Sequence, residues 1–249
     1  MKVGIFLDGQ LRMTDHVINM TLRIFADAFP GAEFVYAIWE KDYEERKELI
    51  DTFEGAVELI KEYDIHYHPY EENRNAVNTK NFKKKLWYPN PDRHLHQTKQ
   101  ILNHNTLMKK HRHKYDVIIR TRFDSIVSPS EEFGQFIEQV YEEPCVYSFQ
   151  DQPNRREKRK FFQWYSITPE DVKCKMVFDG GIIIYPSTWW DSELVERLHN
   201  TKKLLAAEFG WYQVLVGDRH INYYVGDGAA TLTRCVRKSE WKIIEDMMG

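Results

Sequence analysis

The chain has 249 residues, of which 42% are hydrophobic and 29% charged, and its formal net charge at pH 7 is −3. This composition is typical of a soluble globular protein and argues against a globally basic nucleic-acid-binding protein. Its three cysteines, Cys145, Cys174 and Cys235, are far apart and odd in number, so we expect neither a zinc site nor a disulfide scaffold.

No apolar run approaches the roughly 20 residues that span a bilayer. The first apolar stretch reaches Asp8 after a few residues, which favours a buried strand over a signal peptide. We therefore expect a cytoplasmic protein, in the host cytoplasm if the chain is viral, with no membrane span.

The first part of the chain alternates between predicted strands and helices. Thr14 is placed to cap a helix with one apolar face, which Pro30 and Gly31 close. Such a βαβαβ pattern is typical of a parallel sheet covered by helices. The predicted strands are 2–7, 33–39 and 65–70, with a charged helical region over 42–63 and a long loop over 71–92.

The second part continues the alternation without a break in composition. We predict helices over 93–113, 130–141, 186–199 and 218–225, and strands over 115–119, 145–149, 176–178 and 182–185. The whole chain, 1–249, is therefore expected to be a single domain, with a nucleotide-binding half over about 1–125 and an acceptor half over about 126–249.

Two polar segments directly follow predicted strands, where open parallel sheets bind ligands. The first is Gly9-Gln10-Leu11-Arg12, and the second is Arg120-Thr121-Arg122-Phe123-Asp124. Arginines at these positions can pair with phosphate oxygens, glycine lets a backbone approach a ligand, and Asp124 suits Mg²⁺ or Mn²⁺. A solvated turn with a surface ion pair would produce the same pattern.

Taken in order, several motifs resemble the small bacterial and viral glycosyltransferases of the GT-A fold, including proteins related to capsule and lipopolysaccharide biosynthesis. The matching residues are Gly9–Arg12, then Gln97, then Tyr115–Asp124, then Phe178-Asp179-Gly180-Gly181. The resemblance covers roughly residues 1–190. It implies an α/β fold of the GT-A-like Rossmann type, with a mostly parallel sheet flanked by helices.

The resemblance also implies an activity and the residues that carry it: a transferase that uses a nucleotide sugar, such as a UDP-sugar, and a divalent cation, Mn²⁺ or Mg²⁺. Asp124 would bind the metal, with His220 completing its shell, although Arg122 replaces the first acidic residue of the family's DxD motif. Asp218 would be the catalytic base, its alternative role being a helix N-cap, and Asp179 would face sugar hydroxyls. The implied donor-binding residues are Asp8, Gly9, Gln10, Arg12, Arg120, Arg122, Gly180 and Gly181.

The acceptor is open between a glycan and a hydroxymethylated base in viral DNA. Two basic loops, one of them running into aromatic residues, suit a polyanion with stackable groups, and they suit exposed loops beside packed strands equally well. The candidate acceptor-binding residues are Lys84, Arg155, Arg156 and Trp164. Five histidines over 94–113 are expected to form a solvated polar face, not a metal site.

Two other functions fit the same pattern. A nucleotidyltransferase would share the parallel sheet and the residues that bind phosphate, but the chain has no glycine-rich loop with a signature lysine. A non-catalytic protein that binds nucleotides or glycans would keep the fold and explain the missing first Asp of the DxD motif. The oligomeric state is not predicted by the sequence.

Overall fold

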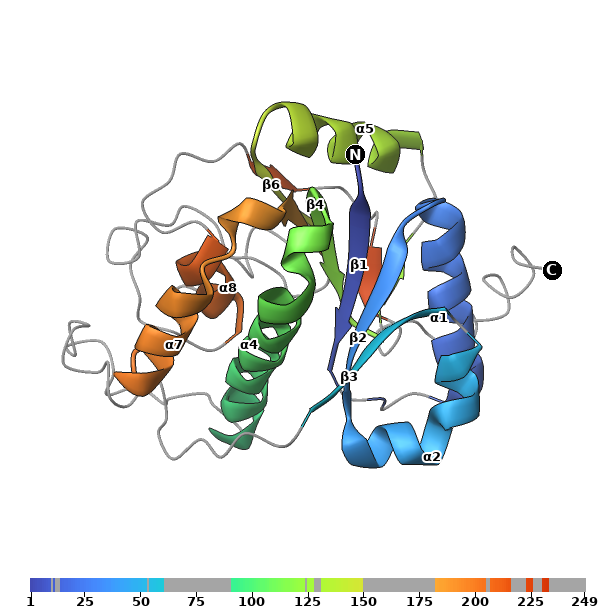
Figure 1. The fold of residues 1–249 in the computed structure, drawn as a ribbon, viewed down its shortest axis with the longest axis horizontal. Coiled ribbons are helices and arrows are strands. Elements are labelled where there is room, and N and C mark those ends of the chain that lie inside the picture. The colour runs from blue at the N-terminus through green and yellow to red at the C-terminus, as the bar shows by residue number, and fades with distance from the viewer. Residues whose placement is uncertain are drawn as a thin grey trace, which may run out of the picture.

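A computed structural model of the chain describes residues 1–9, 11, 14–52, 54–60, 91–123, 125–127, 131–149, 182–204, 207–215, 223–225 and 230–232. A twisted sheet forms the centre, with helices packed on both of its faces (Figure 1). Among the described helices, none combines the length and the apolar character needed to cross a bilayer.

The first half of the chain forms the predicted βαβαβ unit. It consists of β1 (Val3–Asp8), α1 (Asp15–Ala28), β2 (Glu33–Trp39), α2 (Glu40–Asp51) and β3 (Gly55–Ile60). Both pairings, β1 with β2 and β2 with β3, are parallel. Thr14 occupies the predicted N-cap position of α1.

The prediction for the segment after α2 was wrong in its boundaries. The helix ends at Asp51 and the third strand lies at Gly55–Ile60, inside the region predicted to be helical. The reason is that β3 is a partly exposed edge strand in which Glu58 interrupts a short apolar run, directly after a charged helix. Residues 65–70, where the strand was expected, lie outside the described residues.

The second half confirms most of the remaining elements. The predicted helices over 93–113 and 130–141 and the strands over 115–119, 145–149 and 182–185 are all present, within a few residues. The observed elements are α4 (Pro91–His111), η3 (Arg112–Lys114), β4 (Val117–Thr121), β5 (Ser125–Val127), α5 (Glu131–Glu142), β6 (Val146–Phe149), β7 (Ile182–Pro186), η4 (Ser187–Trp189), α7 (Ser192–Asn200), α8 (Ala207–Leu215), β8 (Tyr223–Val225) and β9 (Ala230–Leu232).

Two helices differ from the prediction. The helix expected from 186 begins at Ser192, because the Asp191 side chain accepts a hydrogen bond from the Leu194 amide and caps the helix there. Residues 223–225, expected to end the last helix, form β8, which pairs with β6. The last described helix is instead α8, for which no prediction was made.

The main sheet has the strand order β3-β2-β1-β4-β7-β6-β8. Only β7 runs against its neighbours, since it is antiparallel to both β4 and β6, and the sheet is therefore mostly parallel. A second, two-stranded sheet joins β5 to β9, and β5 lies against α1.

Each face of the main sheet has its own hydrophobic core. The core under α1 and α5 contains Leu7, Phe25, Tyr36 and Ile137, while the core under α4, α7 and α8 contains Phe6, Met108 and Trp190. Burial on both faces explains why the strands are nearly continuous apolar runs.

Candidate functional site

The order of the parallel strands reverses between β1 and β4. From β1 the chain adds β2 and β3 on one side, and it then returns to place β4 on the other side of β1. Open α/β sheets bind ligands in the crevice at the carboxyl ends of the two strands at such a switch point. Here β1 ends at Asp8 and is followed by Gly9, while β4 ends with Arg120 and Thr121 and is followed by Arg122.

Asp8 and Arg120 form a buried ion pair between these two strands. Both side chains are fully buried. The Arg120 Nε donates to Asp8 Oδ2 over 3.0 Å, and an Arg120 terminal nitrogen donates to Asp8 Oδ1, so the pair is bidentate. The Arg120 guanidinium also lies 4.3 Å from the ring centre of Trp211, within range of a cation–π interaction.

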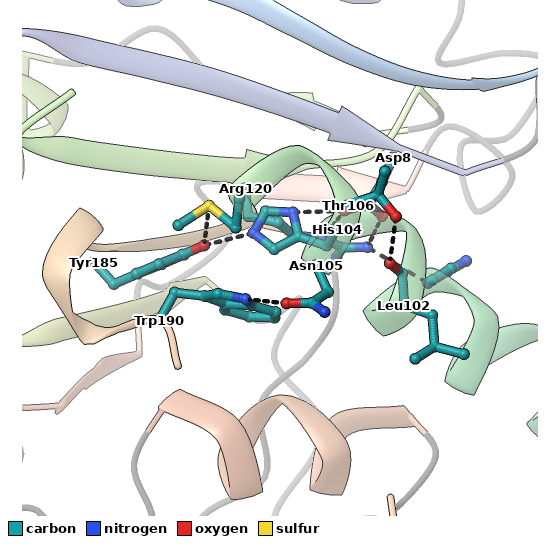
Figure 2. Close-up of polar contacts among 10 residues, drawn as sticks. Asp8, Leu102, His104, Asn105, Thr106, Arg120, Tyr185 and Trp190 are labelled. Carbon is teal, nitrogen blue, oxygen red and sulfur yellow. Dashed lines mark hydrogen bonds and ion pairs between the residues drawn. The ribbon is translucent and has the colours of Figure 1, made fainter. Parts of the chain in front are cut away.

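His104, on the helix α4 that covers this face of the sheet, contacts the Asp8–Arg120 pair. Its Nδ1 lies 3.1 Å from Asp8 Oδ2, and its Nε2 lies 2.5 Å from the hydroxyl of Tyr185 on β7 (Figure 2). The imidazole is fully buried and edge-on to the rings of Trp190 and Trp211, at centroid distances of 4.7 and 5.2 Å. The segment after η4 is tied in by the hydrogen bond that the Trp190 indole donates to Asn105 over 2.9 Å.

The environment sets the protonation state of each member. Burial by itself would raise the pKa of the Asp8 carboxyl, but the Arg120 charge and the hydrogen bonds from His104 and Arg120 outweigh it, so this pKa is lowered. Burial lowers the pKa of His104, and the Asp8 carboxylate offsets that effect only in part. Burial likewise raises the pKa of Tyr185 well above its usual value.

The hydrogen-bond directions follow from those states. A carboxylate only accepts, so the neutral His104 carries its proton on Nδ1 and donates it to Asp8. His104 Nε2 is then an acceptor, to which the Tyr185 hydroxyl donates. The chain Tyr185–His104–Asp8–Arg120 is therefore satisfied along its length and neutral overall, and it supports the carboxyl end of β1 on the face of the sheet that α4 covers.

The loop after β1 begins with an unusual backbone conformation. Gly9 has a φ of +131°, which L side chains rarely adopt, and no described heavy atom lies within 4 Å of the place a Cβ would occupy. A glycine here allows both the turn and the close approach of another group to the backbone.

The end of β4 is held from the opposite face of the sheet. Phe123 is 1% exposed and stacks on Tyr36 of β2, and the Ser125 amide donates to the Arg122 carbonyl over 3.2 Å. Arg122 between them is half-buried. The residues on both sides of Asp124 are thus fixed, while Asp124 itself lies outside the described residues.

Four of the predicted donor-binding residues are described. The structure brings Asp8 and Arg120 into direct contact and places Gly9 and Arg122 at the carboxyl ends of adjacent strands. A phosphate role for Arg120 would need its pair with Asp8 to open, and that role remains a prediction. The other predicted site residues lie outside the described part of the chain: Gln10, Arg12, Lys84, Asp124, Arg155, Arg156, Trp164, Asp179, Gly180, Gly181, Asp218 and His220.

The prediction that the histidines over 94–113 form a solvated face was wrong for His104 and His111. His104 is fully buried and His111 is 8% exposed. Both continue the apolar row of α4 formed by Ile101 and Met108, with the spacing of three and four residues that marks the inner face of a helix. That spacing is the signal by which the buried network could have been found. Among the described residues, no group of three or more His, Cys, Asp or Glu side chains is placed to hold a metal ion.

No protein-family model and no curated protein matches the sequence. Solved structures do resemble the fold. The 4-diphosphocytidyl-2C-methyl-D-erythritol synthase from Anaerococcus prevotii DSM 20548 has 10% sequence identity and a TM-score of 0.53, over 99% of this chain and 97% of that one.

Two glycosyltransferases show weaker similarity. Core-mannan synthase A from Aspergillus fumigatus, in its Mn/GDP form, has 12% identity and a TM-score of 0.49, over 90% of this chain and 73% of that one. Mouse xyloside xylosyltransferase 1 has 12% identity and a TM-score of 0.40, over 91% and 84%. Identities this low speak to the fold alone, and the fold is the predicted GT-A-like Rossmann type, with a mostly parallel sheet flanked by helices.

Proposed function

We propose that this chain is a glycosyltransferase that moves a sugar from a nucleotide-sugar donor to an acceptor hydroxyl. One observation carries the proposal: the two polar segments predicted to bind a nucleotide diphosphate follow adjacent strands, β1 and β4, at the switch point of the sheet. The glycine after β1, with its positive φ and open surroundings, suits a backbone that a phosphate approaches closely.

The predicted site residues divide into those that would meet the donor and those that would support it. Gly9 would lie against the diphosphate, and Arg122 would pair with its oxygens together with Arg12. Asp8 and Arg120, being buried and paired, would hold the ends of the two strands at a fixed separation. Asp218 would accept the proton of the acceptor hydroxyl, and Asp179 would bind sugar hydroxyls.

A divalent cation, Mn²⁺ or Mg²⁺, would be held by Asp124 with His220. The oxygen chemistry of Asp124 fits such an ion, and the buried neighbours Phe123 and Ser125 would fix its position in the chain. When bound, the cation would neutralise the diphosphate as the sugar–phosphate bond breaks. The half-buried Arg122 would supply a second positive charge beside it.

The test of the proposal is to identify the product released from each class of donor. Glycosyl transfer breaks the bond between the anomeric carbon and the diphosphate, so it releases a nucleoside diphosphate. We expect the purified protein to release nucleoside diphosphate from at least one nucleotide sugar, slowly with water and faster with an acceptor, and Asp124→Ala to abolish release while the circular dichroism spectrum is unchanged. Near-normal activity of Asp124→Ala at saturating Mn²⁺ would contradict the central role of Asp124.

A nucleotidyltransferase is the second candidate, favoured by the fold similarity to the 4-diphosphocytidyl-2C-methyl-D-erythritol synthase over nearly the whole of both chains. In nucleotidyl transfer the acceptor phosphate attacks the α-phosphorus of a nucleoside triphosphate, so the nucleoside monophosphate part joins the acceptor and the β- and γ-phosphates leave as pyrophosphate. Incubation with the four ribonucleoside triphosphates and a set of sugar phosphates, followed by a pyrophosphate assay, separates the two activities. Pyrophosphate release without any turnover of nucleotide sugars would replace the first proposal by the second.

A non-catalytic protein that binds nucleotides or glycans would give neither product. It would still be stabilised by its ligand, because a ligand that binds only the folded state raises the apparent stability. A thermal-shift series with nucleoside diphosphates therefore distinguishes binding without turnover from the absence of binding.

A further inference from the structure

Leu11, three residues after the end of β1, is held by two side chains from α2. The Leu11 amide donates to Asp42 Oδ2 over 3.1 Å, and Arg46 Nη1 donates to the Leu11 carbonyl over 2.6 Å. Both contacts are partly buried. Leu11 lies in neither a helix nor a strand, so these side chains supply the hydrogen bonds that secondary structure would otherwise provide.

Asp42 and Arg46 both reach Leu11 from α2. Asp42 and Arg46 are four positions apart, a spacing that places side chains on one helix face. At Arg46 the helix is interrupted by a non-helical backbone conformation, with φ −135° and ψ 25°. The Arg46 Nε also pairs with Asp15, in the first turn of α1, at 3.2 Å. The Arg46 guanidinium therefore joins α2, the loop and the start of α1.

The Leu11 side chain is anchored as well as its backbone. It is 5% exposed and belongs to the core under α1. Its amide and its carbonyl are parts of the two peptide groups that link it to Gln10 and Arg12, the neighbours predicted to bind the donor. The two hydrogen bonds and the buried side chain together restrict the backbone of Leu11 itself.

We infer that Asp42 and Arg46 are positioning residues that hold the loop after β1 in the conformation that binds the donor diphosphate. This inference rests on the proposed function. Neither side chain would touch the donor. They act by setting the backbone before binding, because a loop ordered in advance loses less conformational entropy when its ligand arrives.

The variants to compare are Asp42→Ala, which removes the acceptor, Asp42→Asn, which keeps an oxygen acceptor, and Arg46→Ala. The controls are Glu45→Ala and Lys47→Ala, which remove exposed charges of the same signs from the same helix. Three quantities are measured: hydrogen exchange of the Leu11 amide, the dissociation constants of UDP, GDP, CDP and ADP by calorimetry, and those of the corresponding nucleosides.

We expect faster exchange at Leu11 in Asp42→Ala, a smaller change in Asp42→Asn, and no change in the controls. The best-bound diphosphate should bind roughly tenfold more weakly to Asp42→Ala and Arg46→Ala, the scale of one lost hydrogen bond to a charged group, whereas its nucleoside should bind nearly as before.

Unchanged hydrogen exchange at the Leu11 amide in Asp42→Ala would show that Asp42 does not hold the backbone at Leu11, and it would overturn the inference. Faster exchange with unaltered diphosphate affinity would show that the contacts only stabilise the fold, and it would overturn the inference while leaving the proposed function intact. If the unmodified protein binds none of the four diphosphates, the proposed function fails, and the claim about the donor fails with it.

Discussion

At the scale of single residues, the Asp8–Arg120 pair dominates the energetics of the candidate site. Both groups are fully buried, so removing one leaves the other as an uncompensated charge in the interior. We expect Arg120→Met to lower the free energy of unfolding by about 3–5 kcal/mol, measured by urea denaturation.

The matched variant is Asp8→Asn combined with Arg120→Met. The amide oxygen of asparagine keeps an acceptor for the His104 Nδ1–H while the buried negative charge is gone. The double variant should therefore be more stable than Arg120→Met alone. A double variant that is the less stable of the two would show that the charge of Asp8 is not what Arg120 offsets.

His104 gives the protein a specific pH dependence. Its pKa is lowered by burial in the folded state, so below about pH 6.5 the unfolded chain takes up a proton that the folded chain resists. The free energy of unfolding should fall as the pH drops from about 6.5 towards the lower pKa of the folded state. His104→Gln should reduce that slope by up to about 1.4 kcal/mol per pH unit, the limit for one proton.

Exposed His113, changed to Gln, is the control for a non-specific histidine effect. A direct readout on the unmodified protein is the ¹⁵N NMR spectrum of the imidazole, which should show a neutral His104 ring with its proton on Nδ1 at pH 6. The lowered pKa of Asp8 affects stability only at more acidic pH, where the carboxyl of the unfolded chain takes up its proton. Burial also lowers the pKa of His199, so over pH 5 to 8 the contribution of His104 is the difference between the unmodified protein and His104→Gln. Titration of His104 near pH 6.5 would refute the buried neutral network.

At the scale of elements, the closeness of β3 to β2 depends on Gly55. A Cβ at this position would lie 2.7 Å from the Phe34 carbonyl oxygen and 2.7 Å from Tyr36 Cε2. Since Phe34 and Gly55 are register partners, the backbone of β2 cannot move aside without disturbing the pairing. We expect Gly55→Ala to destabilise the protein by roughly 1–3 kcal/mol, the usual cost of overpacking.

Gly134, in α5, is the internal comparison. No described heavy atom lies within 4 Å of its Cβ position, and it is exposed on the helix. Gly134→Ala should raise the free energy of unfolding by about 0.5–1 kcal/mol, because alanine favours the helix. Thermal denaturation of both variants checks the pair, and equal shifts in the same direction would contradict the close approach of β3.

At the scale of the whole molecule, charge can distinguish the two acceptor classes. The net charge of −3 does not prevent local binding of a polyanion, because salt confines the relevant field to about 10 Å. If the acceptor is DNA, Arg155→Glu with Arg156→Glu should weaken DNA binding and reduce its salt dependence, since fewer counterions are released. Transfer to a neutral oligosaccharide should be unaffected.

The control for this charge reversal is Arg23→Glu with Lys47→Glu, which makes the same change in charge at exposed positions of α1 and α2. Binding is measured on hydroxymethylated DNA over a salt series, and transfer on DNA and on oligosaccharides. Absence of DNA binding by the unmodified protein at low salt would remove DNA as the acceptor and leave the glycan.

Much of the architecture was determined by the sequence alone. Strands such as β1, β2 and β4 are nearly uninterrupted apolar runs because both of their faces are buried, and that pattern is visible without a structure. The same runs end in polar residues, which marked the carboxyl edge of the sheet as the place for a site. The edge strand β3 was misplaced because its partial exposure leaves a weaker, charged pattern.

Only the tertiary structure decided what the residues of the site do to one another. Asp8 and Arg120 are 112 positions apart, and their contact depends on the parallel register of β1 with β4. The network is completed by Tyr185 from an antiparallel strand and by His104, a polar residue on an apolar helix face. A histidine within a charged sequence resembles a solvated one until the packing of a helix onto the sheet removes its water, and that burial is a property of the fold and not of the local sequence.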